Sequence, residues 1–202
     1  MAGWSAHEGI AVSLPLENVD TDQLIPARFM SAPRTAGYGG FLLHDLRRDG
    51  EGRLRADLAL NRVPEASVLV TRRNFGSGSS REAAVYALWD AGFRAVLAPG
   101  FGDIFAGNAV NNGLLPARMD ADVIEDLIAA MAGEGVPVRL DLEACAATLC
   151  GAAHGFHIEP IWRVKLMKGW DDIDLTVSRR CRIDCFRTAR AAAEPWAFPD
   201  TW

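Results

Sequence analysis

The chain has little cysteine, and its cysteines do not form a metal-binding pattern. Its 202 residues include four cysteines, at Cys145, Cys150, Cys181 and Cys185. Cys181 and Cys185 are one helical turn apart, but neither pair has the Cys-x2-Cys spacing of zinc or iron–sulfur ligands. We therefore expect buried or incidental thiols and no metal bound by this chain alone.

Long apolar runs and an excess of basic charge are also absent. No apolar run approaches the roughly 18 residues of a membrane-spanning helix, so no membrane association is expected. Residues 1–8 lack the basic start and apolar core of a signal peptide, so we expect a cytoplasmic protein. The formal net charge is −5, which argues against nucleic acid binding. For the arginines over 179–190, a solvated helix face or a subunit contact is preferred to RNA binding.

Strand and helix patterns alternate along the chain and predict an α/β fold. Half of the residues are hydrophobic, and the length fits one domain, with or without an appended arm. Two successive strand–helix units predict parallel strands with right-handed crossovers, and later short strands could pair antiparallel. The expected strands cover residues 9–16, 67–72, 94–98, 136–142, 147–150 and 156–158. The expected helices cover residues 80–91, 102–111, 121–132, 160–169, 171–177 and 179–193.

The most informative segment lies between one predicted strand and its helix, where residues 74–82 read NFGSGSSRE. Gly76 and Gly78 allow positive φ and a close approach to a ligand. Ser79 or Ser80 can cap the helix, whose free N–H groups attract an anion. Arg81 offers a planar fork for a carboxylate or phosphate. Both the dinucleotide and the ATP-loop fingerprints are incomplete, so a plain strand-to-helix turn is the alternative to an anion site.

Six segments in order along the chain resemble the small subunits of isopropylmalate isomerases (3-isopropylmalate dehydratases), which correspond to the swivelling domain of aconitase-family enzymes. The segments are NVDTDQLIPARF (18–29), NFGSGSSRE (74–82), GFRAVLAP (92–99), FGDIF (101–105), NNGLLP (111–116) and DDIDLT (171–176). The resemblance implies an aconitase-like swivelling β/β/α domain, with a partly parallel central sheet or barrel flanked by helices. It implies one domain over 1–202, a substrate-specificity loop at about 30–40 and a helical arm at about 160–202.

The resemblance also implies a reaction, a cofactor and a partner. The family moves a hydroxyl group between adjacent carbons of a 2-substituted malate by dehydration and rehydration, as in leucine biosynthesis. A 4Fe–4S cluster acts as the Lewis acid, and its cysteines are expected on a separate large subunit. This chain is expected to bind no cofactor itself, to act only with that subunit on a small dicarboxylate, and to be capable of self-association when isolated.

By resemblance, Ser79 is the base that takes and returns the proton, and Asp22 organises that transfer. Substrate binding is assigned to Ser80, Arg81, Gly78 and Thr21, and, in the specificity loop, to Arg34 and Tyr38. Ser80 could instead cap the helix, Arg81 could form a surface ion pair, and Asp20 could simply form a turn. Met30, Pro33 and Tyr38 favour an alkyl or aryl substituent on the substrate over a third carboxylate, although Arg34 leaves that choice open.

The chain departs from the family pattern near the serines. The family usually has His after Ser-Ser-Arg-Glu, where this chain has Ala83, and Gly100 and Gly102 replace the commoner Ser and Ala. We prefer a subunit for a related substituted malate over an inactive one, because Ser79, Arg81 and Asp22 are retained. Two alternatives stand beside this prediction: an aconitase-like hydratase subunit for another hydroxy acid, and a non-catalytic anion-binding assembly subunit.

Overall fold

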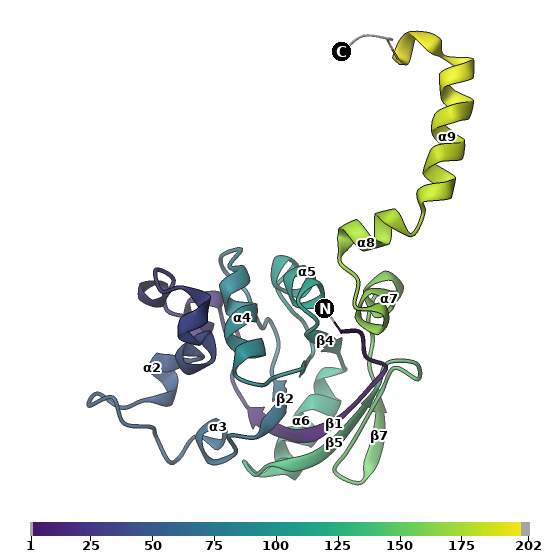
Figure 1. Ribbon diagram of the computed structural model, residues 1–202. Helices are drawn as coiled ribbons and strands as arrows, with labels where there is room; N and C mark the ends of the chain where they lie inside the picture. Colours follow the sequence, from purple (N-terminus) through teal and green to yellow (C-terminus); the bar gives the residue numbers. More distant parts are fainter. Residues whose placement is uncertain (1, 199–202) are drawn as a thin grey trace.

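A seven-stranded mixed sheet forms the centre of the molecule, in a computed structural model that describes residues 2–198 (Figure 1). The strand order is β4-β3-β2-β1-β5-β6-β7. The strands β1 to β4 run parallel to one another, and β5, β6 and β7 extend the sheet antiparallel from β1. The strand bounds are Ala6–Leu14 (β1), Ala66–Thr71 (β2), Ala95–Ala98 (β3), Leu115–Arg118 (β4), Val136–Asp141 (β5), Ala146–Leu149 (β6) and Ala152–Gly155 (β7).

Helices cover both faces of the sheet and continue into an arm at the carboxyl end of the chain. The α-helices are Thr21–Leu24 (α1), His44–Arg47 (α2), Ala59–Arg62 (α3), Glu82–Asp90 (α4), Asp103–Asn111 (α5), Ala121–Met131 (α6), Pro160–Lys168 (α7), Asp172–Val177 (α8) and Arg180–Ala193 (α9). Short 3-10 helices occupy Ala27–Phe29 (η1), Arg34–Ala36 (η2), Tyr38–Phe41 (η3) and Pro195–Ala197 (η4).

Alternate residues of the parallel strands feed two hydrophobic cores. On β2, Leu69 packs into the core under α4, whereas Val68 and Val70 pack into the core under α6. This alternation follows from the two-residue period of a strand, which sends successive side chains to opposite faces. The parallel strands are therefore covered on both sides, as is usual for parallel sheets.

Most expected elements are confirmed to within about three residues, a normal uncertainty for element ends. Two expectations were wrong. Within the strand expected at 156–158 only His157 pairs, in a single bridge to Arg118, and the strand itself lies just before it at β7. The strand β4, which contains Pro116, was not expected. Pro116 is tolerated because β4 is an edge strand, where a missing N–H need not break the ladder.

Candidate active site

Three loops that carry the motifs meet at one edge of the sheet. They follow β1, β2 and β3, and the carboxyl ends of neighbouring parallel strands lie together, which is the usual place for a ligand site in such sheets. Backbone hydrogen bonds join the loops: the Gly76 N–H donates to the Val19 carbonyl (2.7 Å), and the Phe75 N–H donates to the Gly100 carbonyl (3.1 Å). Thr21 N–H donates to the Ser77 carbonyl at 2.9 Å. The serine turn, residues 74–81, is thus held from both sides.

Two glycines of the serine turn have the left-handed backbone that the sequence predicts. Gly76 has φ +73° and Gly78 has φ +93°. A Cβ added to Gly76 would lie 2.2 Å from the Phe105 ring, and one added to Gly78 would lie 3.4 Å from Asp20 Cβ. Gly76 therefore permits a packing contact, and Gly78 permits the bend that presents the serines.

The serines are exposed and do not cap the helix. The helix α4 begins at Glu82 with Arg81 as its N-cap residue, and no side chain caps it, so the expectation that Ser79 or Ser80 caps this helix was wrong. Within residues 2–198 neither serine hydroxyl has a hydrogen-bond partner. The turn therefore presents two free hydroxyls beside the uncapped N-terminus of α4, whose dipole favours an anion.

Thr21 lies underneath the serine turn rather than at its surface. Its side chain is buried, and its Oγ1 donates a hydrogen bond to the Ser79 carbonyl at 3.0 Å. The proton of that hydroxyl is already donated, so Thr21 supports the serine turn from below, and its expected substrate contact stays a prediction that this hydrogen bond does not favour. Gly78 has no side chain, so the substrate contact expected of it could come only from its backbone.

Asp22 and Arg81 form an ion pair across the two loops. The Arg81 side chain is 21% exposed and that of Asp22 52% exposed, so the pair lies at the edge of the site and Asp22 is partly open to solvent. Arg81 was expected either to bind substrate or to form a surface ion pair. The ion pair is present, and it holds the guanidinium beside the serine turn. The neighbouring Asp20 caps α1 through a capping box with Gln23. This local structural role agrees with the alternative that Asp20 only forms a turn.

The expected specificity loop packs along α4, and it does not bring Arg34 to the serines. Arg34 pairs with Asp90 (2.9 Å) at the far end of α4 and stacks over the Tyr86 ring at 4.0 Å. About 12 Å of helix separates Asp90 from Glu82. Tyr38 is buried, and its hydroxyl donates to the Ala32 carbonyl at 2.8 Å. Their substrate-binding roles stay predictions that these contacts do not favour.

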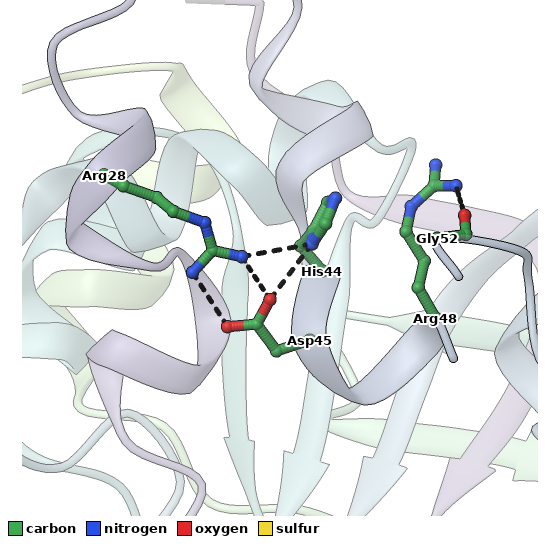
Figure 2. Close-up of polar contacts among 5 residues, drawn as sticks. All are labelled: Arg28, His44, Asp45, Arg48 and Gly52. Atoms are coloured by element: carbon green, nitrogen blue, oxygen red, sulfur yellow. Dashed lines mark hydrogen bonds and ion pairs between the residues drawn. The ribbon is translucent and has the colours of Figure 1, made fainter. Parts of the chain in front are cut away.

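A charged cluster that the sequence did not suggest closes the base of this loop (Figure 2). Arg28 Nη1 donates to Asp45 Oδ2 at 2.9 Å, and His44 Nδ1 lies 3.1 Å from Asp45 Oδ1. Hydrogen bonds from Arg28 and then His44 lower the pKa of Asp45 to about 2. Figure 2 also shows Arg48 donating to the Gly52 carbonyl (2.7 Å), which closes the next loop. Because Arg28 lies 17 residues before Asp45 in the sequence, no local pattern reveals the cluster.

A surface pocket opens beside Asp22, between the loop after β1 and α2. Its lining combines apolar side chains with three carboxylates: Leu16, Val19, Leu43 and Leu46 with Gln23 and with Asp20, Asp22 and Asp45. The pocket therefore offers apolar contact next to the ion pair. Asp22 and Asp45 are paired with Arg81 and Arg28, so the carboxylate that would repel an anionic substituent is Asp20, which has no ion pair in the described part of the chain.

Comparisons with known proteins agree with the motifs. A family profile described as the aconitase C-terminal domain matches residues 1–122. The 3-isopropylmalate dehydratase small subunit of Rhodospirillum centenum is 42% identical over 201 residues, covering 98% of this chain and 99% of that protein. The chain belongs to the family of 3-isopropylmalate dehydratase small subunits. A second small subunit of this family, from Granulibacter bethesdensis, is 45% identical over 195 residues, covering 94% of this chain and 92% of that protein.

A solved structure supports the fold of this family member. The 3-isopropylmalate dehydratase of Methanocaldococcus jannaschii matches with a TM-score of 0.65 and 23% identity, covering 89% of this chain and 98% of that one. At that identity the likeness speaks for the fold alone, which is an α/β architecture with a mixed, partly parallel, curled sheet flanked by helices. The expected fold class is therefore confirmed. The name small subunit, which the relatives in this family carry, implies a large-subunit partner.

The residues of this family member do not fit an iron–sulfur cluster. Over residues 2–198, no three His, Cys, Asp or Glu side chains converge as a metal site. The four cysteines are free, with Cys145 half-buried and the others exposed, so of the two expected kinds, buried or incidental thiols, the exposed three are of the incidental kind. No helix in the described part of the chain could span a membrane.

Proposed function

We propose that this small subunit supplies half of an active site, with Ser79 as the base and Arg81 as the ligand of a substrate carboxylate. The observation that carries the proposal is the serine turn itself. It presents an exposed hydroxyl, an uncapped helix N-terminus and an arginine together at the carboxyl edge of the parallel strands. Ser80 would contact the same carboxylate.

The chemistry of these residues follows from their surroundings. A serine hydroxyl is a poor base, so its anion needs nearby donors, and the uncapped N–H groups of α4 and the Arg81 guanidinium are placed to stabilise it. Ser79 would then take the proton from the carbon next to a substrate carboxylate and return it during rehydration. Arg81 would hold that carboxylate with its fork while Asp22 keeps the guanidinium oriented.

The partner completes the site. We place the 4Fe–4S cluster on the large subunit, where it supplies a Lewis acid for the hydroxyl that leaves and returns. The partner surface would also cover the exposed serine turn and exclude water from the reaction. We place the complex in the cytoplasm, where four free cysteines stay reduced, and we propose that residues 1–202 swivel as one domain against the large subunit.

The pocket beside Asp22 supports an alkyl or aryl substituent on the malate. The lining of this pocket holds no basic side chain, so a third carboxylate, as in citrate, would meet the carboxylate of Asp20 without a compensating charge, and like charges at close range are destabilising. Leu16, Val19, Leu43 and Leu46 would instead contact an isopropyl or larger apolar group. Ala83, where the family usually has His, is half-buried against the core and adds no polar group to this region.

A reconstitution assay tests this function. The chain is combined anaerobically with its cognate large subunit, and turnover is measured with 2-isopropylmalate, 2-benzylmalate and citrate. We expect activity with an alkyl- or arylmalate and little with citrate. Preference for citrate would support the aconitase-like alternative, and a stable complex without turnover on any 2-hydroxy acid would support a non-catalytic assembly subunit.

A further inference from the structure

The helices α8 and α9 project from the body of the molecule (Figure 1). Both carry apolar side chains, and in the described part of the chain none of their residues is buried. On α9, Ile183 and Phe186 are three residues apart and so share a face, and Phe186 is 66% exposed. A groove between α7, α8 and α9 is lined by Ile161, Leu175, Ile183 and Phe186, with Arg179 and Arg182.

Such a helix needs a partner surface. An isolated helix of about 14 residues is marginal in water, because most helix stability in proteins comes from packing one face. Exposed apolar side chains gathered in one place are typical of interaction sites. In this structure α9 buries no face, yet its surface is not entirely polar. Packing its apolar face against another protein would therefore stabilise it.

The start of this arm is linked by side-chain contacts to the first residue of α4, which follows the serine turn. Lys165 of α7 is 4% exposed and binds both Asn111, at the end of α5, and Asp172 (2.7 Å), at the start of α8. The adjacent Asn112 donates to Glu82 Oε1 at 2.8 Å, and Glu82 directly follows Arg81. A short series of hydrogen bonds therefore joins the first residue of α4 to the first turn of α8. A protein that covers the serine turn is thus within reach of the arm.

The charge of the arm indicates what kind of surface it fits. Residues 178–198 include five arginines but only two acidic residues. Asp184 and Glu194 pair with Arg180 and Arg190, so three arginines, Arg179, Arg182 and Arg187, have no ion pair with another residue in the described part of the chain. The matching surface is apolar at its centre and acidic around it.

The family comparison indicates which protein carries that surface. The aconitase C-terminal domain profile ends at residue 122, whereas separate small subunits match through 98% of this chain. Relatives that are separate small subunits therefore align through the region of the arm as well, and a separate small subunit must bind its large-subunit partner without a covalent link. We propose that α8 and α9 dock on the large subunit, with Phe186 and Ile183 in an apolar groove bordered by carboxylates. This inference rests on the proposed two-subunit function.

The test compares dissociation constants for the full-length chain and its cognate large subunit, measured anaerobically by biolayer interferometry. Phe186→Ala should weaken the complex about ten-fold or more, the effect of removing a central aromatic contact. Arg182→Glu should weaken it comparably, with a loss that shrinks at high salt. Leu54→Ala is the matched control, since Leu54 is 52% exposed but lies between α2 and α3. At saturating large subunit, turnover of the Phe186 variant should match the wild type.

The outcomes separate this inference from the proposed function. If Phe186→Ala and Leu54→Ala bind as tightly as the wild type, the docking role of the arm is wrong and the serine chemistry is untouched. If Ser79→Ala binds normally and retains turnover, the proposed chemistry is wrong and the docking role stands. Sedimentation of the isolated chain tests whether a second copy of this chain, and not the large subunit, covers the apolar face. If the chain forms a dimer that Phe186→Ala dissociates, while binding to the large subunit is unchanged, the inference is wrong.

Discussion

The Thr21 hydroxyl donates a hydrogen bond of 3.0 Å to the carbonyl of Ser79, 58 residues further along the chain. The Thr21 side chain is buried, and the same Ser79 carbonyl accepts a second hydrogen bond from the Arg81 N–H at 2.8 Å. The carbonyl of the proposed base is therefore fixed from below and from within its own turn. This arrangement orients the backbone of Ser79 while leaving its hydroxyl free.

The first prediction follows from that hydrogen bond. Thr21→Val keeps the shape of the side chain but removes the donor, so the serine turn loses one of its supports. We expect the free energy of unfolding to fall by about 1–2 kcal/mol and kcat to fall by about ten- to a hundred-fold, because small misplacements of a base are costly. Thr21→Ser should restore most of the rate. Urea denaturation and steady-state kinetics check both effects, and a Val variant with wild-type kcat would refute the positioning role.

The second prediction concerns the base itself. Ser79→Ala removes an exposed hydroxyl with no partner, so folding and binding of the large subunit should be unchanged. We expect kcat to fall by about two to four orders of magnitude, the usual range for a positioned base. Ser80→Ala is the matched control and should mainly raise KM. Equal kcat losses in both variants would contradict the assignment of Ser79 as the base.

The third prediction separates charge from geometry at Arg81. Arg81→Lys retains the positive charge but loses the planar fork, so KM should rise about ten- to a hundred-fold. Asp22→Asn keeps the size of the side chain and releases the guanidinium from its ion pair. If Asp22 orients Arg81 for the substrate carboxylate, this variant should raise KM as Arg81→Lys does, by a smaller factor. An Arg81→Lys enzyme with unchanged KM would leave Arg81 as a surface ion pair only.

The fold could be predicted from the sequence wherever a pattern is local. A continuous apolar, β-branched run identifies β2, which is buried on both faces, and helix periodicity identifies α6, which is buried on one face. The strand β4, which contains Pro116, was not expected, and only the position of β4 at the sheet edge makes that residue acceptable. Edge position is a property of the assembled sheet, so it has no local signal.

The site was predictable in its residues but not in its contacts. Family motifs bring Ser79, Arg81 and Asp22 to attention, and parallel topology places them at one edge of the sheet. The ion pair between Arg81 and Asp22 joins residues 59 positions apart, and the pairing of Arg34 with Asp90 spans 56. Which acid each arginine pairs with depends on how the loops pack, so the sequence alone could not show that Arg34 pairs with Asp90.

The fourth prediction concerns acid stability. The Arg28 and His44 hydrogen bonds lower the pKa of Asp45 to about 2. A carboxyl whose pKa is lower in the folded state stabilises the fold above its ordinary pKa, and that contribution is lost as the pH falls from about 4 to about 2. Asp45→Asn should therefore make unfolding less dependent on pH in this range. Because the Asp45 side chain is 61% exposed, the effect should be small and should shrink in salt. Thermal unfolding of the wild type and of Asp45→Asn, measured between pH 5 and pH 2, checks this effect. The same dependence of Tm on pH in both proteins would contradict it.

The last prediction uses the contact between Gly76 and Phe105. A Cβ at position 76 would lie 2.2 Å from the ring, and the φ of +73° is unfavourable for any side chain. Either the ring or the serine turn must move, so Gly76→Ala should lower stability by about 1–3 kcal/mol and also lower kcat. Gly100→Ala is the control, because its Cβ would have nothing within 4 Å. Since Phe105→Leu replaces the flat ring with a smaller side chain, it should partly rescue Gly76→Ala. A double variant no more stable than Gly76→Ala would place the cost in the backbone rather than in the ring contact.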